Sequence, residues 1–135
     1  MVTPPMLTVV TGPPCAGKST HVRRHAQCDD IIIDLDRIAL ALAHEGTTHH
    51  AYPPHIRHIA INARAEAIRT ALPLSRDYNV WIIHMQPSKR DWVAYKQHDA
   101  RTIRLDPGYE EVMRRCANER PAWVSTTAHE WYAHA

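Results

Sequence analysis

Short apolar segments alternate along the chain with longer segments whose apolar residues recur at helical spacing. Four segments rich in β-branched residues lie between polar or turn-forming residues, which is typical of short buried strands; they span residues 6–10, 31–33, 80–83 and 102–105. Helical patterns occupy residues 18–27, 37–44, 54–72, 88–97 and 109–118. This alternation predicts an α/β fold with a parallel sheet of about four strands between helices.

The remaining segments add one helix and one loop. The last ten residues, TTAHEWYAHA, are typical of a closing helix with Thr126 or Thr127 as its N-cap and Trp131 as its apolar anchor. Residues 44–54 have the composition of a loop between two helices. A chain of 135 residues is long enough for one core and too short for two ordinary domains, so we expect one domain over residues 1–135.

The stretch GPPCAGKST, residues 12–20, fits the pattern GxxxxGK[ST] and lies between a predicted strand and a predicted helix. Such a loop binds phosphates through backbone N–H groups and the positive end of the helix dipole. Lys18 is expected to contact the β- and γ-phosphates, and Ser19 to offer its hydroxyl to Mg²⁺. The other expected nucleotide-binding residues are Gly12, Pro13, Cys15, Ala16, Gly17 and Thr20. ATP and Mg²⁺ are therefore the expected ligands.

Carboxylates follow the second predicted strand. The stretch IIIDLDRIA places Asp34, Asp36 and Arg37 where the strand ends, and ligands in open α/β sheets bind outside the carboxyl ends of strands. A carboxylate there can accept the proton of an attacking hydroxyl, and an arginine can hold the acceptor. Asp36 is equally suited to cap the next helix, whereas Asp34 is better explained by a function than as a solvated strand end.

The phosphate loop, the DxD followed directly by arginine, and a late arginine-bearing helix together resemble the small P-loop kinases. The resemblance is strongest to the kinase domain of bacteriophage polynucleotide kinase and its AAA-type or zeta-toxin-like relatives, and it covers most of the chain. It implies a three-layer α/β/α fold with strand order 2-3-1-4 and a small lid. It also implies that Asp34 is the general base, with Asp36 as the alternative, and that Arg37 helps to bind the substrate.

The resemblance also implies a lid whose arginines clamp the ATP phosphates. The stretch LDPGYEEVMRRCANERP supplies Arg114, Arg115 and Arg120 at the corresponding place. The planar guanidinium suits charge that spreads over a transferring phosphoryl group. The alternative is an ordinary solvated helix end with basic residues near its C-terminus.

Two features depart from the family pattern. The third strand ends in His84, where many relatives place the aspartate that supports Mg²⁺, so Asp36 or Asp106 is the candidate to replace it. His84 either contacts the acceptor or completes the strand. The residues after the lid form no clear fifth strand, which agrees with a four-stranded sheet.

In this architecture the long helix from residue 54 covers the acceptor. Arg57 and Arg64 lie seven residues apart and share a helix face, so with His58 they are candidates to bind a phosphate or a base edge; a solvated face is the alternative. Four histidines occur here, His49, His50, His55 and His58. Because no Cys, Asp or Glu joins them, a polar or substrate-facing surface is favoured over a metal site.

Charge and cysteine content narrow the setting. The net charge of +2 permits a nucleic acid substrate without requiring one. The three cysteines form no CxxC pair, which favours a reducing, cytoplasmic setting over a disulfide framework. No apolar run approaches the ~20 residues needed to span a membrane, so no membrane association is expected.

Three function classes remain. The favoured one is an ATP-dependent kinase that phosphorylates a hydroxyl of a nucleic acid, a modified base or a nucleoside. The second is a nucleoside monophosphate kinase, which needs arginines for the acceptor phosphate more than it needs a base. The third is a non-catalytic nucleotide-binding protein. Removal of the Asp34 carboxylate should abolish the first activity and leave much of the second.

Overall fold

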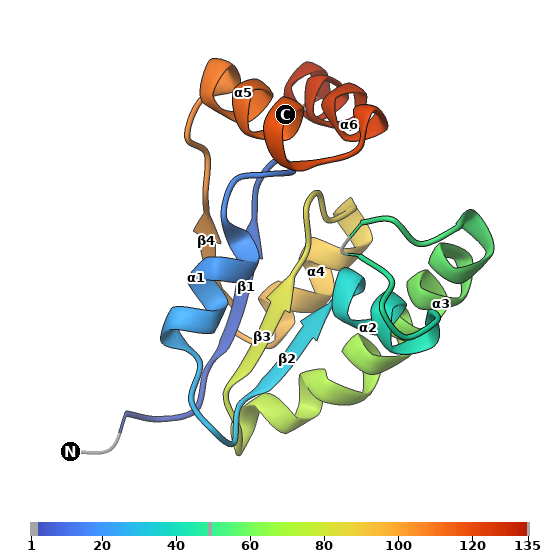
Figure 1. Cartoon of the computed structure of the whole chain (residues 1–135). Coiled ribbons are helices and arrows are strands. Elements are labelled where there is room, and N and C mark those ends of the chain that lie inside the picture. The colour runs from blue at the N-terminus through green and yellow to red at the C-terminus, as the bar shows by residue number, and fades with distance from the viewer. Residues whose placement is uncertain (1–2, 49, 135) are drawn as a thin grey trace.

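The computed structural model describes residues 3–48 and 50–134, and it contains one parallel four-stranded sheet (Figure 1). The strand order is β2-β3-β1-β4, as predicted. The strands are β1 (Leu7–Thr11), β2 (Ile31–Asp34), β3 (Val80–Ile83) and β4 (Arg101–Arg104). Each lies within one residue of the segment predicted from its apolar pattern.

Helices follow each strand. They are α1 (Lys18–His25), α2 (Leu35–Leu42), α3 (Pro54–Ala71), α4 (Lys89–Gln97), α5 (Tyr109–Glu119) and α6 (Ala122–His134), with a 3₁₀ helix η1 (Leu72–Arg76). No helix in the described part of the chain is long and apolar enough to cross a membrane.

Alternation along the strands divides the core into two layers. Val9, Ile33 and Ile82 face one side of the sheet and pack with Ala71, Leu72 and Tyr95 from α3, η1 and α4. Val10 and Ile83 face the other side, where they pack with Val22 of α1. Successive strand residues point to opposite faces, so a continuous apolar run is buried on both. The predicted three-layer α/β/α arrangement is thereby confirmed.

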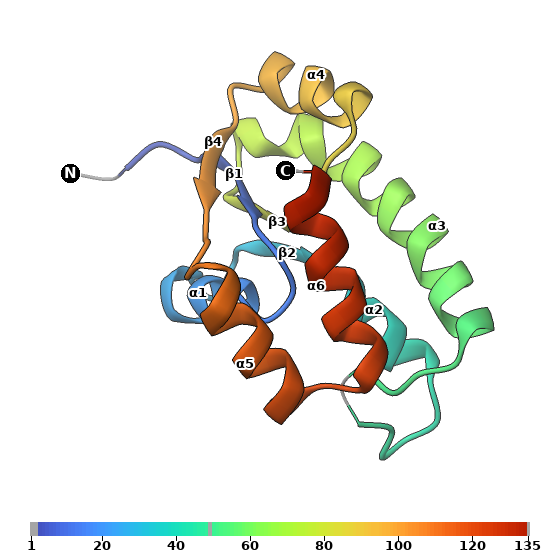
Figure 2. The same ribbon diagram turned by 90° about the horizontal axis from the view of Figure 1, so that it is seen from above.

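Helices α5 and α6 lie side by side beyond the carboxyl ends of the strands (Figures 1 and 2). Val112, Cys116, Val124 and Ala128 form a small core between them. Trp131 is buried, as expected, and its indole N–H donates to the Met85 carbonyl at 2.9 Å. This pair of helices occupies the position expected for the lid.

The start of the closing helix was predicted wrongly. The helix begins at Ala122 rather than after Thr126 or Thr127, because the Val124 N–H already bonds to the Pro121 carbonyl at 3.0 Å. The Thr127 hydroxyl lies within the helix and donates to the carbonyl of Trp123, one turn earlier. The shift places an additional helical turn above the sheet edge.

Candidate active site

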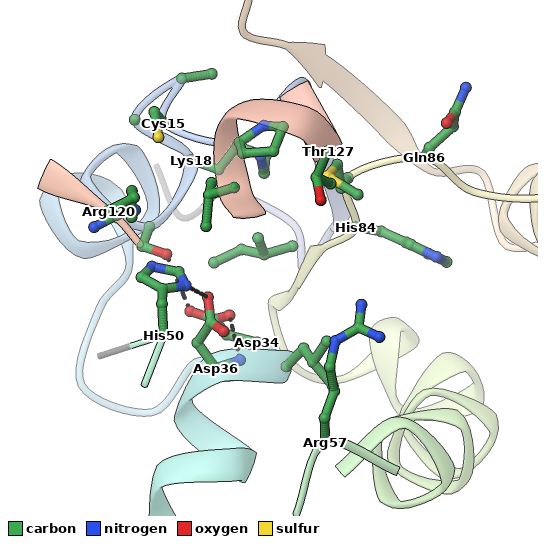
Figure 3. Close-up of a pocket in the computed structure, with 18 of the residues that line it drawn as sticks. Cys15, Lys18, Asp34, Asp36, His50, Arg57, His84, Gln86, Arg120 and Thr127 are labelled. Carbon is green, nitrogen blue, oxygen red and sulfur yellow. Dashed lines mark hydrogen bonds and ion pairs between the residues drawn. The ribbon is translucent and has the colours of Figure 1, made fainter. Parts of the chain in front are cut away.

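A pocket of about 400 Å³ lies between the carboxyl ends of β2 and β3, the phosphate loop, α3 and α6 (Figure 3). Residues from the loop between α2 and α3 close one side of it. A pocket of this volume is in the range that holds a small-molecule ligand. Its position at the carboxyl edge of the sheet matches the place where ligands bind in such folds.

The phosphate loop connects β1 to α1, and residues 14–20 line the pocket. Gly17 has φ 92° and directly precedes α1, whose first turn receives no side-chain cap. The Lys18 ammonium donates to the carbonyls of Gly12 and Pro13 at 2.8 and 2.6 Å. Burial lowers the pKa of Lys18 to about 8, although nearby Cys15, Asp34 and Asp36 act in the opposite direction. Lys18 is thus held in the loop by carbonyls that an anionic ligand can replace.

The residues of the phosphate loop are suited to bind a nucleoside triphosphate. The helix N-terminus and the buried ammonium both favour negative charge. Arg120 lines the same pocket, and its Nε is buried with no hydrogen-bond partner among the residues that the structure describes. A buried guanidinium donor without a partner is costly, and a phosphate oxygen would satisfy it.

Asp34 is the buried end of β2 and the N-cap of α2. Its Oδ1 accepts a hydrogen bond from the Asp36 N–H at 3.1 Å, and its Oδ2 accepts one from the Ser19 hydroxyl at 3.1 Å. The cap is therefore Asp34, which corrects the suggestion that Asp36 caps this helix. The Ser19 contact brings a carboxylate to the residue expected to bind Mg²⁺.

Asp36 lies in the same pocket and holds the loop between α2 and α3 (Figure 3). Its carboxylate accepts a hydrogen bond from the Tyr52 hydroxyl and lies 3.3 Å from Nδ1 of His50. Burial and this bond raise the pKa of Tyr52 above its ordinary value. Asp36 is thus engaged in structural contacts, whereas Asp34 faces the phosphate loop. His50 and Tyr52 were not singled out as a pair by the sequence, because loop composition carries no information about contacts.

His84 lies at the end of β3 and is nearly buried. Its Nδ1 forms a 2.8 Å hydrogen bond with the Tyr95 hydroxyl, and its Nε2 lies 3.8 Å from the Asp91 carboxylate. Burial, aided by nearby Arg64, lowers the pKa of His84 to about 4. His84 is therefore neutral near pH 7 and anchored to α4, while it still lines the pocket.

Asp106 does not reach the pocket. Its Oδ1 accepts hydrogen bonds from the Gly108 N–H and the Tyr132 hydroxyl, and its side chain is exposed. Of the two carboxylates considered as replacements for the missing strand-end aspartate, only Asp36 lines the pocket.

The three lid arginines lie in different surroundings. Arg114 is exposed and pairs with Glu111 at 2.6 Å, outside the pocket. Arg115 shares that carboxylate at 2.9 Å and donates to the Cys15 carbonyl at 3.3 Å, so it contacts the back of the phosphate loop. These two arginines lower the pKa of Glu111 to about 2. Arg120 alone of the three lines the pocket.

The residues expected at the acceptor are also divided. Arg57 and Arg64 line the pocket, whereas His58 is exposed and lies outside its lining. Arg37 is exposed and borders a neighbouring hollow that shares Ser19 and Asp34 with the main pocket. His49 lies outside the described residues. Within the described ranges, no group of three or more His, Cys, Asp or Glu side chains is placed to hold a metal.

Helix α6 contributes three pocket residues that sequence reasoning missed, Trp123, Val124 and Thr127. Trp123 and Thr127 lie four residues apart on one face of this helix. Their spacing would have indicated this face if the helix had been predicted to begin at Ala122. Trp123 is about half exposed although it is a large apolar side chain.

A phosphate loop at the carboxyl edge of a parallel sheet of order 2-3-1-4, closed by a helical lid, defines a P-loop kinase-like fold. The family described as AAA domain matches residues 7–120, and the chain belongs to this family. No curated protein gave a significant match.

Solved structures show the same fold. A chain in the structure of the Pnkp1/Rnl/Hen1 RNA repair complex is similar with a TM-score of 0.66 and 17% identity, over 98% of this chain and 44% of that chain. A chain in a structure of the Pnkp1/Rnl/Hen1 complex is similar with a TM-score of 0.57 and 18% identity, over 86% of this chain and 40% of that chain. The present chain thus spans less than half the length of either.

Proposed function

We propose that the chain transfers the γ-phosphate of ATP to a hydroxyl group, with the 5′ end of a nucleic acid as the favoured acceptor. The observation that carries the proposal is the 3.1 Å hydrogen bond from Ser19 to the buried carboxylate of Asp34. It supports a base beside the transferring group, which a hydroxyl acceptor requires and a phosphate acceptor does not.

The proposed reaction uses this chain's residues in three ways. The phosphate loop and Lys18 bind the triphosphate, and Asp34 accepts the proton of the acceptor hydroxyl as its oxygen bonds to the γ-phosphorus. The bond from that phosphorus to the bridging oxygen breaks, and Arg120 with Lys18 stabilises the negative charge on the phosphates. Mg²⁺, with Ser19 as its protein ligand, would neutralise further phosphate charge.

The acceptor side of the pocket supports a nucleotide more than a small alcohol. Trp123 offers an aromatic face on which a base can stack, and Arg57 and Arg64 offer guanidinium groups for a phosphate. The RNA repair complex that contains a structural neighbour agrees with a nucleic acid acceptor. The same arginines also suit a nucleoside monophosphate, so that acceptor remains the second candidate.

The test is transfer of γ-labelled phosphate from ATP to 5′-hydroxyl RNA and DNA, hydroxymethylated DNA, nucleosides and nucleoside monophosphates. We expect label on a 5′-hydroxyl end, lost in both Lys18→Ala and Asp34→Asn and kept in Asp77→Asn. Asp77 is an exposed aspartate at the end of η1, outside the pocket, and serves as the matched control. Label on monophosphates that survives Asp34→Asn would establish the second candidate instead.

A further inference from the structure

Two cysteines from distant parts of the chain meet behind the phosphate loop. The Sγ atoms of Cys15 and Cys116 lie 2.6 Å apart, although the residues are 101 positions apart in sequence. Cys15 belongs to the phosphate loop, has φ 64° and lines the pocket. Cys116 belongs to α5 and is fully buried.

The pair joins the loop to the lid. Cys15 packs against the core formed by Val112, Cys116, Val124 and Ala128 of α5 and α6. Arg115 reinforces the contact, because its Nη1 donates to the Cys15 carbonyl. The third cysteine, Cys28, is exposed and lies on the connection between α1 and β2. The cysteine contact is therefore part of the surface where the phosphate loop meets the lid.

We propose that Cys15 and Cys116 are a redox modification site, which a hydroperoxide converts reversibly into a disulfide that fastens the phosphate loop to the lid. A disulfide has an S–S length of about 2.05 Å, so a shift of roughly half an ångström would bring the two sulfurs to bonding distance. Disulfides in reducing compartments are usually transient and regulatory, which agrees with the setting expected from the cysteine content.

The chemistry needs only the two thiols and the peroxide. Cys15 opens onto the pocket, so its sulfur attacks one peroxide oxygen; the O–O bond breaks, and the second oxygen leaves as water or an alcohol. The resulting sulfenic acid is then attacked by the Cys116 sulfur. The S–S bond forms as the S–O bond breaks, and the oxygen leaves as water with the proton of the Cys116 thiol. A dithiol reductant returns both thiols by exchange.

Nucleotide binding and exchange require the phosphate loop and the lid to move. Lys18 has to leave the Gly12 and Pro13 carbonyls for the phosphates, and nucleotide exchange needs α5 and α6 to move relative to the loop. A covalent tie opposes both movements. We expect oxidation to lower turnover about tenfold or more and reduction to restore it. The effect on turnover rests on the proposed function, whereas disulfide formation does not.

The first arm of the test is chemical. The protein is treated with hydrogen peroxide, unreacted thiols are alkylated, and peptides are mapped by mass spectrometry without reduction. We expect a linked peptide pair containing Cys15 and Cys116 in the unmodified chain and in Cys28→Ser, and its absence in Cys116→Ala. Overoxidation of Cys15 with no linked pair, or a pair that involves Cys28, would overturn the proposal.

The second arm measures ATP affinity and γ-phosphate transfer before oxidation, after oxidation and after reduction. We expect losses in the unmodified chain and in Cys28→Ser that a dithiol reverses, and constant values in Cys116→Ala. A mapped disulfide without any change in ATP affinity or transfer would overturn the regulatory effect. If no acceptor is phosphorylated even by the reduced protein, the proposed function fails, while the mapping and ATP binding still test the site.

Discussion

The Ser19 hydroxyl donates to Oδ2 of Asp34, while Oδ1 of the same carboxylate caps α2. One aspartate therefore fixes the start of a helix and faces the loop that is expected to hold the phosphates. The capping hydrogen bond, which Oδ1 accepts from the Asp36 N–H, orients the carboxylate. If Asp34 is the base, as proposed, it needs no rearrangement before it accepts a proton.

Asp34→Asn should lower phosphate transfer to a hydroxyl by about 10²–10⁴-fold, because asparagine cannot take up the proton. Asparagine is also a good N-cap, so the folded structure and ATP binding should persist. The matched variant is Asp36→Asn, which removes a neighbouring carboxylate that contacts Tyr52 and His50. The measurements are the transfer rate and the calorimetric ATP affinity of both variants. A greater loss of transfer in Asp36→Asn than in Asp34→Asn would identify Asp36 as the base.

The lid arginines should differ in their effect on catalysis. Arg120→Ala should lower transfer about 10²–10³-fold, since Arg120 lines the pocket with a buried donor. Arg115→Ala should have a smaller effect through the phosphate loop, and Arg114→Ala, whose partner Glu111 lies outside the pocket, the smallest. Steady-state kinetics of the three variants give the order, and equal losses would contradict the assignment.

ATP binding should weaken above the pKa of Lys18, which is about 8 in the free protein. Phosphate binding favours the charged ammonium, so Kd should be steady below pH 8 and then rise by up to about tenfold per pH unit. The free protein should become more stable between pH 8 and 10.5, because there the unfolded chain binds a proton that the folded one does not.

Calorimetric titration of ATP from pH 6.5 to 10 checks the first effect, and chemical denaturation over the same range checks the second. Lys18→Met removes the titrating group. In this variant the ATP affinity and the unfolding free energy should therefore depend less on pH than in the unmodified chain. An ATP affinity that stays constant across this range in the unmodified chain would count against Lys18 as a phosphate ligand.

His84 should make the protein sensitive to mild acid. Its pKa is about 4 in the folded chain against an ordinary 6.5, so below pH 6.5 the unfolded chain gains a proton that the folded chain resists. This contribution should be fully present above pH 6.5 and decrease by about 3 kcal/mol as the pH falls to 4.

Urea denaturation from pH 4 to 7 measures the loss. In His84→Asn the extra loss should be absent, so the difference in unfolding free energy between the two proteins should change with pH. A constant difference would show that His84 titrates normally. The pH–rate profile should show no step from His84 near neutrality.

The fold was predictable because burial on both faces of a parallel sheet leaves a continuous apolar signal, as in the three isoleucines of residues 31–33. The phosphate loop was predictable because its glycines and lysine recur at fixed spacing. The N-cap of α2 was not predictable in the same way, because Asp34 and Asp36 can both cap a helix. Asp34 is the cap because β2 ends at this residue.

Contacts between distant segments could not be predicted from the sequence. Whether Arg114 or Arg120 reaches the pocket depends on the rotation and end of α5, and the charge pattern is the same in either case. Cys15 and Cys116 carry no spacing signal, since their approach results from the docking of α5 on the phosphate loop. Trp123 was missed because a proline can precede a helix or end one.

Gly12 should be the least replaceable glycine, for a reason separate from nucleotide binding. A Cβ built there would lie 2.1 Å from the Leu105 carbonyl oxygen, and φ is 147°. Gly46 has φ 88° with nothing within 4 Å of such a Cβ, so Gly46→Ala isolates the cost of backbone strain. We expect Gly46→Ala to cost about 1 kcal/mol and Gly12→Ala about 3 kcal/mol or more, measured by urea denaturation. Equal costs would mean that the end of β1 can move away from Leu105, and the tight joint that positions the phosphate loop would then lie elsewhere.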